Sequence, residues 1–71
     1  MNIYRLSGTD RAVSAIGTFQ PFSVLVRATS PKSAMDENRE ARYQAGREHI
    51  HYKRVEIKVG RVWSVIPMEE G

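Results

Sequence analysis

The chain has 71 residues, which is enough for one small domain, residues 1–71, and too few for a second. Hydrophobic residues make up 41% and charged residues 27%, a balance that is typical of a globular fold and not of a disordered segment. There is no cysteine, which excludes disulfide staples, thiolate nucleophiles and cysteine-based zinc sites. The net charge is +3, with the cations concentrated in the second half and an acidic tail at about residues 67–71.

The N-terminal ten residues include Arg5 and Asp10 and lack the apolar run of a signal peptide. No segment approaches the roughly 20 apolar residues that span a bilayer. We therefore expect a soluble, cytoplasmic protein without membrane contact.

The first half of the chain predicts two strands. Residues 2–7 contain the β-prone Ile3 and Tyr4, and Gly8 is expected to end this strand. Residues 9–18 read as a long hairpin connection, and the sequence leaves open whether they join the sheet or form a mobile binding loop. Residues 22–28 alternate between two faces and predict a second strand, with Pro21 at its start.

After the second strand the pattern predicts a helix. Ser30 followed by Pro31 matches an N-cap and a proline at the first helical position. The helix should run from about Pro31 to Ala45, where Gly46 can adopt the left-handed conformation that closes it. Its expected inner stripe is small and weakly apolar, so the helix can approach a sheet closely. This stripe comprises Ala34, Asn38, Ala41 and Ala45, with Met35 alongside.

The last part of the chain predicts a hairpin. Apolar and charged residues alternate from Arg54 to Val59, and residues 62–66 form a second strand that Pro67 ends. Gly60 occupies the first central position of the turn, as a type II′ turn requires. In this register Val59 faces Val62 and Lys58 faces Trp63. The fold class is therefore α+β, in the order β-β-α-β-β, with one helix packed on an antiparallel or mixed sheet whose other face is open.

No nucleotide-binding, zinc-protease or calcium-loop motif is present, and so small a domain has little room for a ligand pocket of about 300 Å³. We expect neither catalysis nor a cofactor. His49 and His51 form an H-x-H pair that would share one face of a strand and could chelate a metal. A third ligand is not evident, so we interpret both as capping or surface groups and predict no metal site.

The candidate site is a partner-binding surface of seven residues: Arg42, Arg47, Lys53, Arg54, Lys58, Arg61 and Trp63. If the apolar positions of the hairpin point at the helix, then Arg54, Lys58 and Trp63 point away from it. The other cations would extend this patch where the helix gives way to the sheet. A tryptophan beside cations can anchor a protein partner or stack a base.

A structural interpretation of the same residues stays open. Trp63 can cover the sheet simply as the cross-strand partner of Lys58. The arginines can pair with Asp36, Glu40 or Glu48 and only make the fold soluble.

One stretch carries a resemblance to a known family. The strand QPFSVLVRA, Gln20 to Ala28, followed by a helix and then by Gly46, His49, Arg54 and Ile57, resembles the archaeal ribosomal protein LX family across most of residues 3–59. The resemblance implies a small α+β protein whose Arg47, Lys53, Arg54 and Lys58 would face ribosomal RNA. The segment from Gly8 to Gln20 and the spacing from His49 to Arg54 depart from the family pattern.

The format of the chain is also similar to the small accessory proteins of phages and mobile elements, anti-CRISPR proteins among them. Our preferred hypothesis is a non-enzymatic binding protein that docks onto a larger protein or nucleoprotein assembly, as an inhibitor of this type would. The alternatives are an RNA-binding ribosomal protein similar to LX, and a homodimer that forms through an exposed sheet edge.

Overall fold

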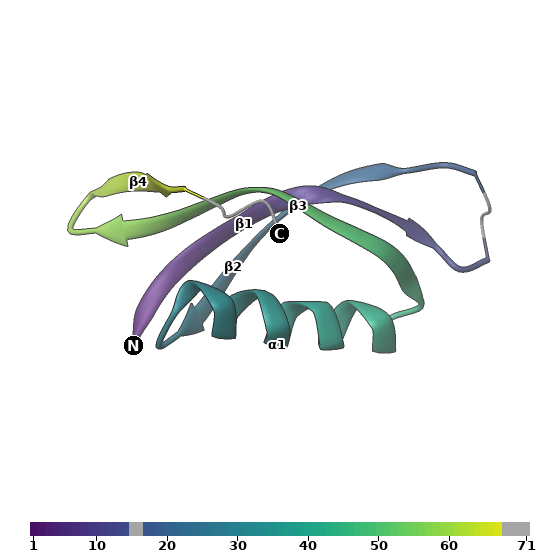
Figure 1. Ribbon diagram of the computed structural model, residues 1–71, viewed down its shortest axis with the longest axis horizontal. Coiled ribbons are helices and arrows are strands. Elements are labelled where there is room, and N and C mark those ends of the chain that lie inside the picture. The colour runs from purple at the N-terminus through teal and green to yellow at the C-terminus, as the bar shows by residue number, and fades with distance from the viewer. Residues whose placement is uncertain (15–16, 68–71) are drawn as a thin grey trace.

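A computed structural model describes residues 1–14 and 17–67 of the chain. Within these ranges the elements are β1 (Asn2–Ala12), β2 (Gln20–Ala28), α1 (Pro31–Gln44), β3 (Arg47–Val59) and β4 (Val62–Ile66) (Figure 1). The strands form one antiparallel sheet in the order β2-β1-β3-β4. The predicted α+β class and the order β-β-α-β-β are confirmed.

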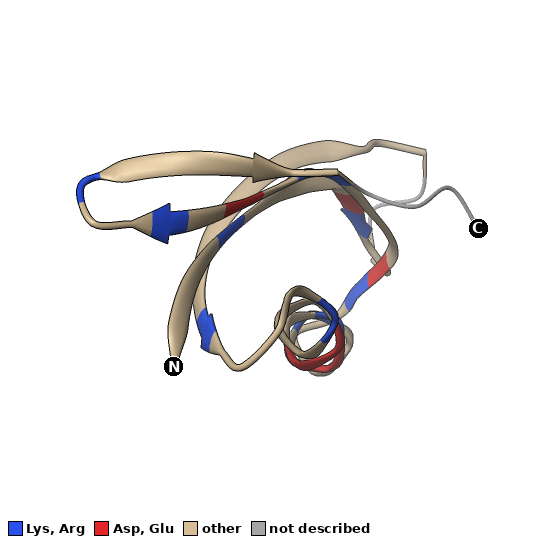
Figure 2. Ribbon diagram, turned by 60° about the vertical axis from the view of Figure 1, so that its left-hand side comes forward, with Lys and Arg blue, Asp and Glu red and all other residues tan. Residues whose placement is uncertain are grey.

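The helix covers only part of the sheet. It packs against β1, β2 and β3, whereas β4 lies beyond its reach within the described residues. Figure 2, which looks nearly along α1, shows the sheet curving around the helix. The sheet therefore has a helix side and an opposite side, which we call the outer face.

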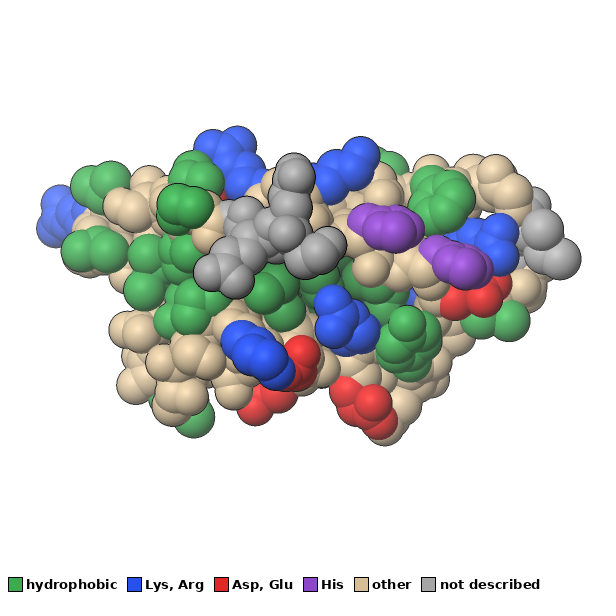
Figure 3. Space-filling model, in the orientation of Figure 1, with side chains coloured by type: hydrophobic (Ala, Val, Ile, Leu, Met, Phe, Trp, Pro, Cys, Tyr) green, Lys and Arg blue, Asp and Glu red, His purple; other side chains and the backbone are tan. Residues whose placement is uncertain are grey.

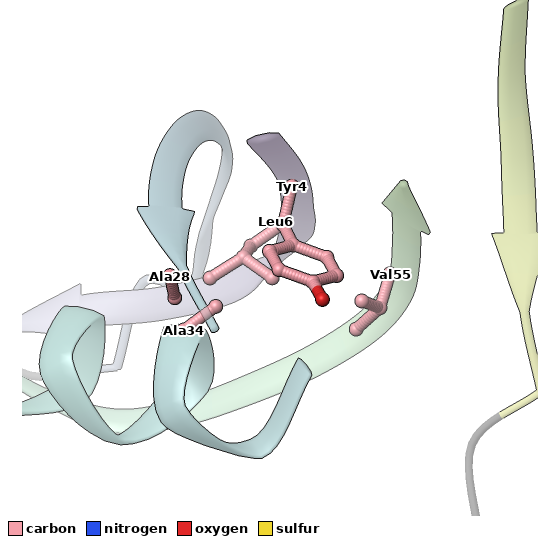
Figure 4. Packing of buried hydrophobic residues seen from close by; sticks show 5 residues of the cluster. All are labelled: Tyr4, Leu6, Ala28, Ala34 and Val55. Carbon is pink, nitrogen blue, oxygen red and sulfur yellow. The ribbon is translucent and has the colours of Figure 1, made fainter. Parts of the chain in front are cut away.

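The core lies between the helix and the middle of the sheet. Tyr4 and Leu6 of β1, Val55 of β3, Ala28 and Ala34 are buried together (Figure 4). The two alanines allow the helix to come close to the strands, and burial of each larger apolar side chain contributes about 1.5–3 kcal/mol. Other apolar side chains close the rim of this core.

Capping interactions fix both ends of α1, close to where the sequence predicts them. The Ser30 Oγ accepts a hydrogen bond of 3.1 Å from the Ser33 amide, and Pro31 occupies the first turn. At the other end Gly46 has a φ of 79°, the left-handed conformation that glycine adopts readily.

The predicted inner stripe of the helix is only partly right. Ala34 is buried and Asn38 is half-buried, but Ala41 and Ala45 are exposed. The next position of the 34–38 row is residue 42, so Arg42 faces the sheet in the last turn.

The prediction that Gly8 ends the first strand is wrong, because β1 continues to Ala12. Gly8 lies inside the strand at a β-bulge, where the pairing with β3 shifts from Arg54 opposite Ser7 to Tyr52 opposite Gly8. A Cβ on Gly8 would lie 1.9 Å from the carbonyl oxygen of His51. Glycine is therefore required here for close approach of the two backbones.

The expected connection at residues 9–18 changes accordingly. Residues 9–12 belong to β1, and residues 15–16 lie outside the described ranges, as do residues 68–71 of the acidic tail. The third strand is also longer than predicted, because it begins at Arg47 and includes His49 and His51. Both histidines, which the sequence predicts to be capping or surface groups, are exposed residues of this strand.

The C-terminal hairpin has the predicted register, with Val59 opposite Val62 and Lys58 opposite Trp63. Gly60 has a φ of 62°, whereas Arg61 does not have a positive φ, which is the combination of a type II′ turn. In the described part of the chain, no helix is long and apolar enough to cross a membrane.

Candidate functional site

The outer face is organised in rows that cross the four strands. One row consists of Leu25, Arg5, Glu56 and Val65, which lie opposite one another on successive strands. The adjoining row contains Ile3 opposite Arg27, and Lys58 opposite Trp63. The alternation of side chains along each strand places these residues on the side away from α1.

An ion pair lies at the centre of the outer face. Arg5 donates two hydrogen bonds to Glu56, from Nε to Oε1 and from Nη2 to Oε2, each 2.8 Å long. Arg54 adds a second cation, with its Nε 3.7 Å from Oε1 of Glu56. The hydrogen bonds between Arg5 and Glu56 lower the pKa of Glu56 and raise that of Arg5, so both groups stay charged at neutral pH.

The same arginine holds the tryptophan. The guanidinium carbon of Arg5 lies 4.5 Å from the centre of the Trp63 ring, a cation–π distance. Trp63 is half-buried, with Arg5 over its ring and Lys58 opposite it on β3. Glu56, Arg5 and Trp63 thus form a connected chain of contacts across three strands.

Apolar side chains flank this polar centre. Leu25 on β2 is 65% exposed and Val65 on β4 is 56% exposed. They stand at the two ends of the row that holds the Arg5–Glu56 pair. The outer face therefore combines fixed charges in the middle with exposed apolar groups on both sides.

The seven predicted site residues do not form one patch. Arg54, Lys58 and Trp63 lie together on the outer face, as the alternation indicated. Lys53 is the exposed extra residue of the β3 bulge, and Arg61 is exposed in the hairpin turn. Arg42 and Arg47 lie elsewhere, on the helix side of the sheet.

These two arginines enclose a carboxylate that sequence reasoning missed. Asp10 is completely buried and accepts hydrogen bonds from Arg47, from Nη2 at 2.7 Å and Nε at 3.1 Å, and from Nε of Arg42. Arg47 also donates to Gln20 at 2.8 Å, and Arg42 lies 4.2 Å from the centre of the Phe22 ring. Arg42 and Arg47 thus pair with an acid, but the acid is Asp10 and not Asp36, Glu40 or Glu48, as the structural interpretation predicts.

The charge state of Asp10 follows from these contacts. Burial raises the pKa of its carboxyl, but the hydrogen bonds and charges of Arg42 and Arg47 outweigh that effect, and the pKa lies below its usual value. Asp10 is therefore ionised, and the Asp10 cluster joins β1 to the last turn of α1 and to the start of β3. The signal that could have found it is the inward alternation of residues 4, 6 and 8, which continues to residue 10.

A second group of side chains lies at the far end of the outer face. Phe19 is 50% exposed, its ring centre lies 6.2 Å from that of His51, and the Arg11 guanidinium lies 6.0 Å from it. Arg11 also pairs with Glu48 at 3.2 Å. Figure 3 shows both histidines side by side at the surface.

The histidine pair is not part of a larger ligand set in the structure. His49 has a φ of 51°, which interrupts the regular alternation of β3 at this residue. Across residues 1–14 and 17–67, no group of three or more side chains that could hold a metal ion comes together, and no pocket is enclosed.

Charge is distributed unequally between the two sides of the molecule. Among residues 1–14 and 17–67, the helix side carries four acids and four cations, whereas the outer face, the bulge and the hairpin turn carry seven cations and two acids. The acids of the helix side are Asp10, Asp36, Glu37 and Glu40. The cations of the outer side are Arg5, Arg11, Arg27, Lys53, Arg54, Lys58 and Arg61.

Compared with protein-family models, with curated proteins and with solved structures, the chain gives no match.

Proposed function

We propose that this chain is a non-enzymatic binding protein of the cytoplasm that docks the outer face of its sheet onto a larger protein or nucleoprotein assembly. The observation that carries the proposal is the charge separation: the excess cations lie on the outer side, beside uncovered apolar side chains. The described residues of the helix side include equal numbers of acids and cations, and each of its four cations pairs with Asp10 or Asp36.

The composition of the outer face is that of a protein interface more than of a solvated surface. Interfaces combine apolar and aromatic anchors with charges that guide association. Leu25, Trp63 and Val65 supply the apolar anchors, and Arg54 and Lys58 supply the positive field. Glu56 fixes Arg5 before any partner arrives, which lowers the conformational entropy lost on binding.

The partner surface that fits is acidic at its centre, with apolar groups on either side. A stoichiometric inhibitor of a larger nucleoprotein machine, of the kind that phages and mobile elements encode, would use such a face to occupy a site on its target. The activity is then a matter of affinity and coverage and needs no catalytic group.

Paired charge variants test the proposal. We expect Arg54→Glu with Lys58→Glu to abolish capture of a partner from a lysate of the source cells, because it reverses the field of the outer face. The matched control is Lys32→Glu with Arg39→Glu, which reverses two cations of the helix surface and should leave capture unchanged. Equal capture by both double variants would overturn the proposal.

A truncation of the tryptophan refines the assignment. We expect Trp63→Ala to weaken the captured complex by tenfold or more, which is the usual effect of removing an aromatic anchor (about 1.4 kcal/mol or more). An unchanged affinity in a folded Trp63→Ala variant would show that Trp63 only covers the sheet.

RNA binding is a second candidate, which the Phe19–His51–Arg11 group favours. An exposed aromatic ring beside cations on an open sheet can stack a base of single-stranded RNA. Titration with polyuridine over a range of salt concentrations, followed by Trp63 fluorescence, separates the two functions. Salt-steep binding that Phe19→Ala weakens would support RNA as the partner, and no binding at low salt would eliminate it.

A further inference from the structure

The strand β4 forms one edge of the sheet, and its sequence is nearly symmetric about its centre. It reads Val-Trp-Ser-Val-Ile, with Ser64 in the middle. It contains no charged residue and no proline, whereas the opposite edge strand, β2, contains Pro21 and Arg27. Charges and prolines are the usual protection of edge strands against further pairing, and β4 lacks both.

The backbone groups on the free edge of β4 can be identified from the hairpin geometry. In a two-residue hairpin the residues that flank the turn, Val59 and Val62, form a hydrogen-bonded pair. The bonded and non-bonded pairs then alternate along the ladder. Trp63 and Val65 therefore direct their N–H and C=O groups away from β3, toward the side of β4 on which the described residues place no further strand.

We propose that β4 is the interface of a symmetric dimer, in which it pairs antiparallel with the β4 of a second copy of the chain. With the two-fold axis at Ser64, Trp63 lies opposite the partner's Val65, and the outward backbone groups of both strands meet. A shift of one residue would place outward groups opposite inward ones and break the ladder. A two-fold axis at Trp63 or at Val65 would still pair outward backbone groups with outward ones, but fewer residues of the two β4 strands would overlap.

Side chains on both faces support this register. On the outer face the Trp63 ring would pack against the partner's Val65, and on the helix side Val62 would pack against the partner's Ile66. Val62 and Val65 are 64% and 56% exposed in the single chain, and the helix does not cover β4. Figure 3 shows hydrophobic side chains gathered at this end of the molecule. The strand is thus complementary to itself, which is what a two-fold interface requires.

The dimer would be weak. A ladder of five residues per copy buries less surface than the roughly 1,200–2,000 Å² of stable complexes. We therefore expect association only at high protein concentration. The inference does not rest on the proposed docking function, because the backbone groups at the edge of β4 carry it, although the side chains of Trp63 and Val65 also belong to the outer face.

Sedimentation velocity over a concentration series tests the dimer. From about 10 µM to about 1 mM the mass should rise from one chain toward two. Val65→Pro should abolish this rise, because it removes an outward N–H without removing a bond to β3. Val65→Lys tests the same edge by charge, for the case that the proline variant does not fold.

The matched control is Val59→Lys. It places the same charge on a valine of similar exposure, 59%, that belongs to β3 and not to the edge. We expect this variant to dimerise like the unmodified chain. A single-chain mass at every concentration, or dimerisation of folded Val65→Pro and Val65→Lys variants at the unmodified level, would overturn the proposal and leave the edge for a strand of another protein.

Discussion

Two carboxylates of this small protein are each bound by arginines, but on opposite sides of the sheet. Both are buried, Asp10 on the helix side and Glu56, which is 4% exposed, on the outer face under Arg5 and Arg54. The arginines of Asp10 come from the end of α1 and the start of β3, so this cluster joins the two layers. Those of Glu56 come from its own strand and its neighbour, so that cluster ties together strands that are already hydrogen-bonded.

The comparison shows that a carboxylate bound by two arginines has different roles on the two sides of the sheet, because the helix covers only one of them. Under the helix, the carboxylate balances two arginines that have less access to water than those of the outer face. On the outer face the same pairing leaves the cations half in solvent, where they orient Trp63 and create a field for a partner. The following changes test that division, beginning with the largest expected effect.

Removing the buried acid should cost most. We expect Asp10→Asn to lower the free energy of unfolding by about 3 kcal/mol, because Arg42 and Arg47 would keep their charges without a counter-ion. Urea denaturation followed by circular dichroism measures this. Asp36→Asn, which removes an exposed acid from α1, is the control and should change the midpoint very little. Equal midpoints for the two variants would contradict a structural role of Asp10.

The glycine that brings the two middle strands together should come next. Gly8→Ala places a Cβ against the His51 carbonyl oxygen, so β1 and β3 must separate at the bulge. We expect a loss of about 2 kcal/mol, in the range of overpacked sites. A thermal melt measures it, with Gly17→Ala as a control that meets no atom within 4 Å, although its φ of 95° carries its own strain. If Gly8→Ala melts at the temperature of the unmodified chain, the close approach is not a constraint.

Acid should weaken the fold through both carboxylates. Their pKa values are lower in the folded chain than in the unfolded chain, so the unfolded chain binds more protons as the pH falls through about 4. The free energy of unfolding should therefore be constant above that region and decrease below it. In Asp10→Asn the free energy of unfolding should decrease less steeply between about pH 5 and pH 2 than in the unmodified chain. Identical slopes would contradict this expectation.

Neutralising the outer carboxylate should have the smallest effect on stability and a visible effect on the tryptophan. Glu56→Gln leaves Arg5 exposed to solvent and free to leave the Trp63 ring. We expect a smaller loss of stability than for Asp10→Asn, together with a shift in Trp63 emission. Fluorescence and urea denaturation on one sample measure both. A loss as large as that of Asp10→Asn would remove the distinction between the two clusters.

The parts of the fold that depend on neighbouring residues could be predicted from the sequence. The hairpin register follows from the position of Gly60 and from strict alternation on both sides. The helix ends follow from Ser30, Pro31 and Gly46, which act within one turn of the helix. The placement of Arg54, Lys58 and Trp63 on one face follows from the same alternation.

The parts that depend on distant contacts could not be predicted in the same way. The sequence predicts that Gly8 ends a strand, because the His51 backbone, whose close approach requires this glycine, is distant in the sequence. If the strand ended at Gly8, Asp10 would not be an inward-facing residue of β1. Without a buried acid at this place, nothing in the sequence indicates that Arg42, and not Ala41 or Ala45, faces the sheet. The separation of the cations into two sites thus follows from one long-range contact.

The position of β1 between β2 and β3 has a consequence for the order in which the chain folds. The β1–β2 hairpin is local and can form early, but its apolar side, with Tyr4 and Leu6, stays uncovered until α1 and β3 are in place. The pairing of Tyr4 with Ile57 closes a loop that spans most of the chain. Such closure is slow compared with the formation of a hairpin or a helix. During synthesis the apolar side of the first hairpin therefore stays exposed, and prone to aggregation, until nearly the whole of the remaining sequence has emerged.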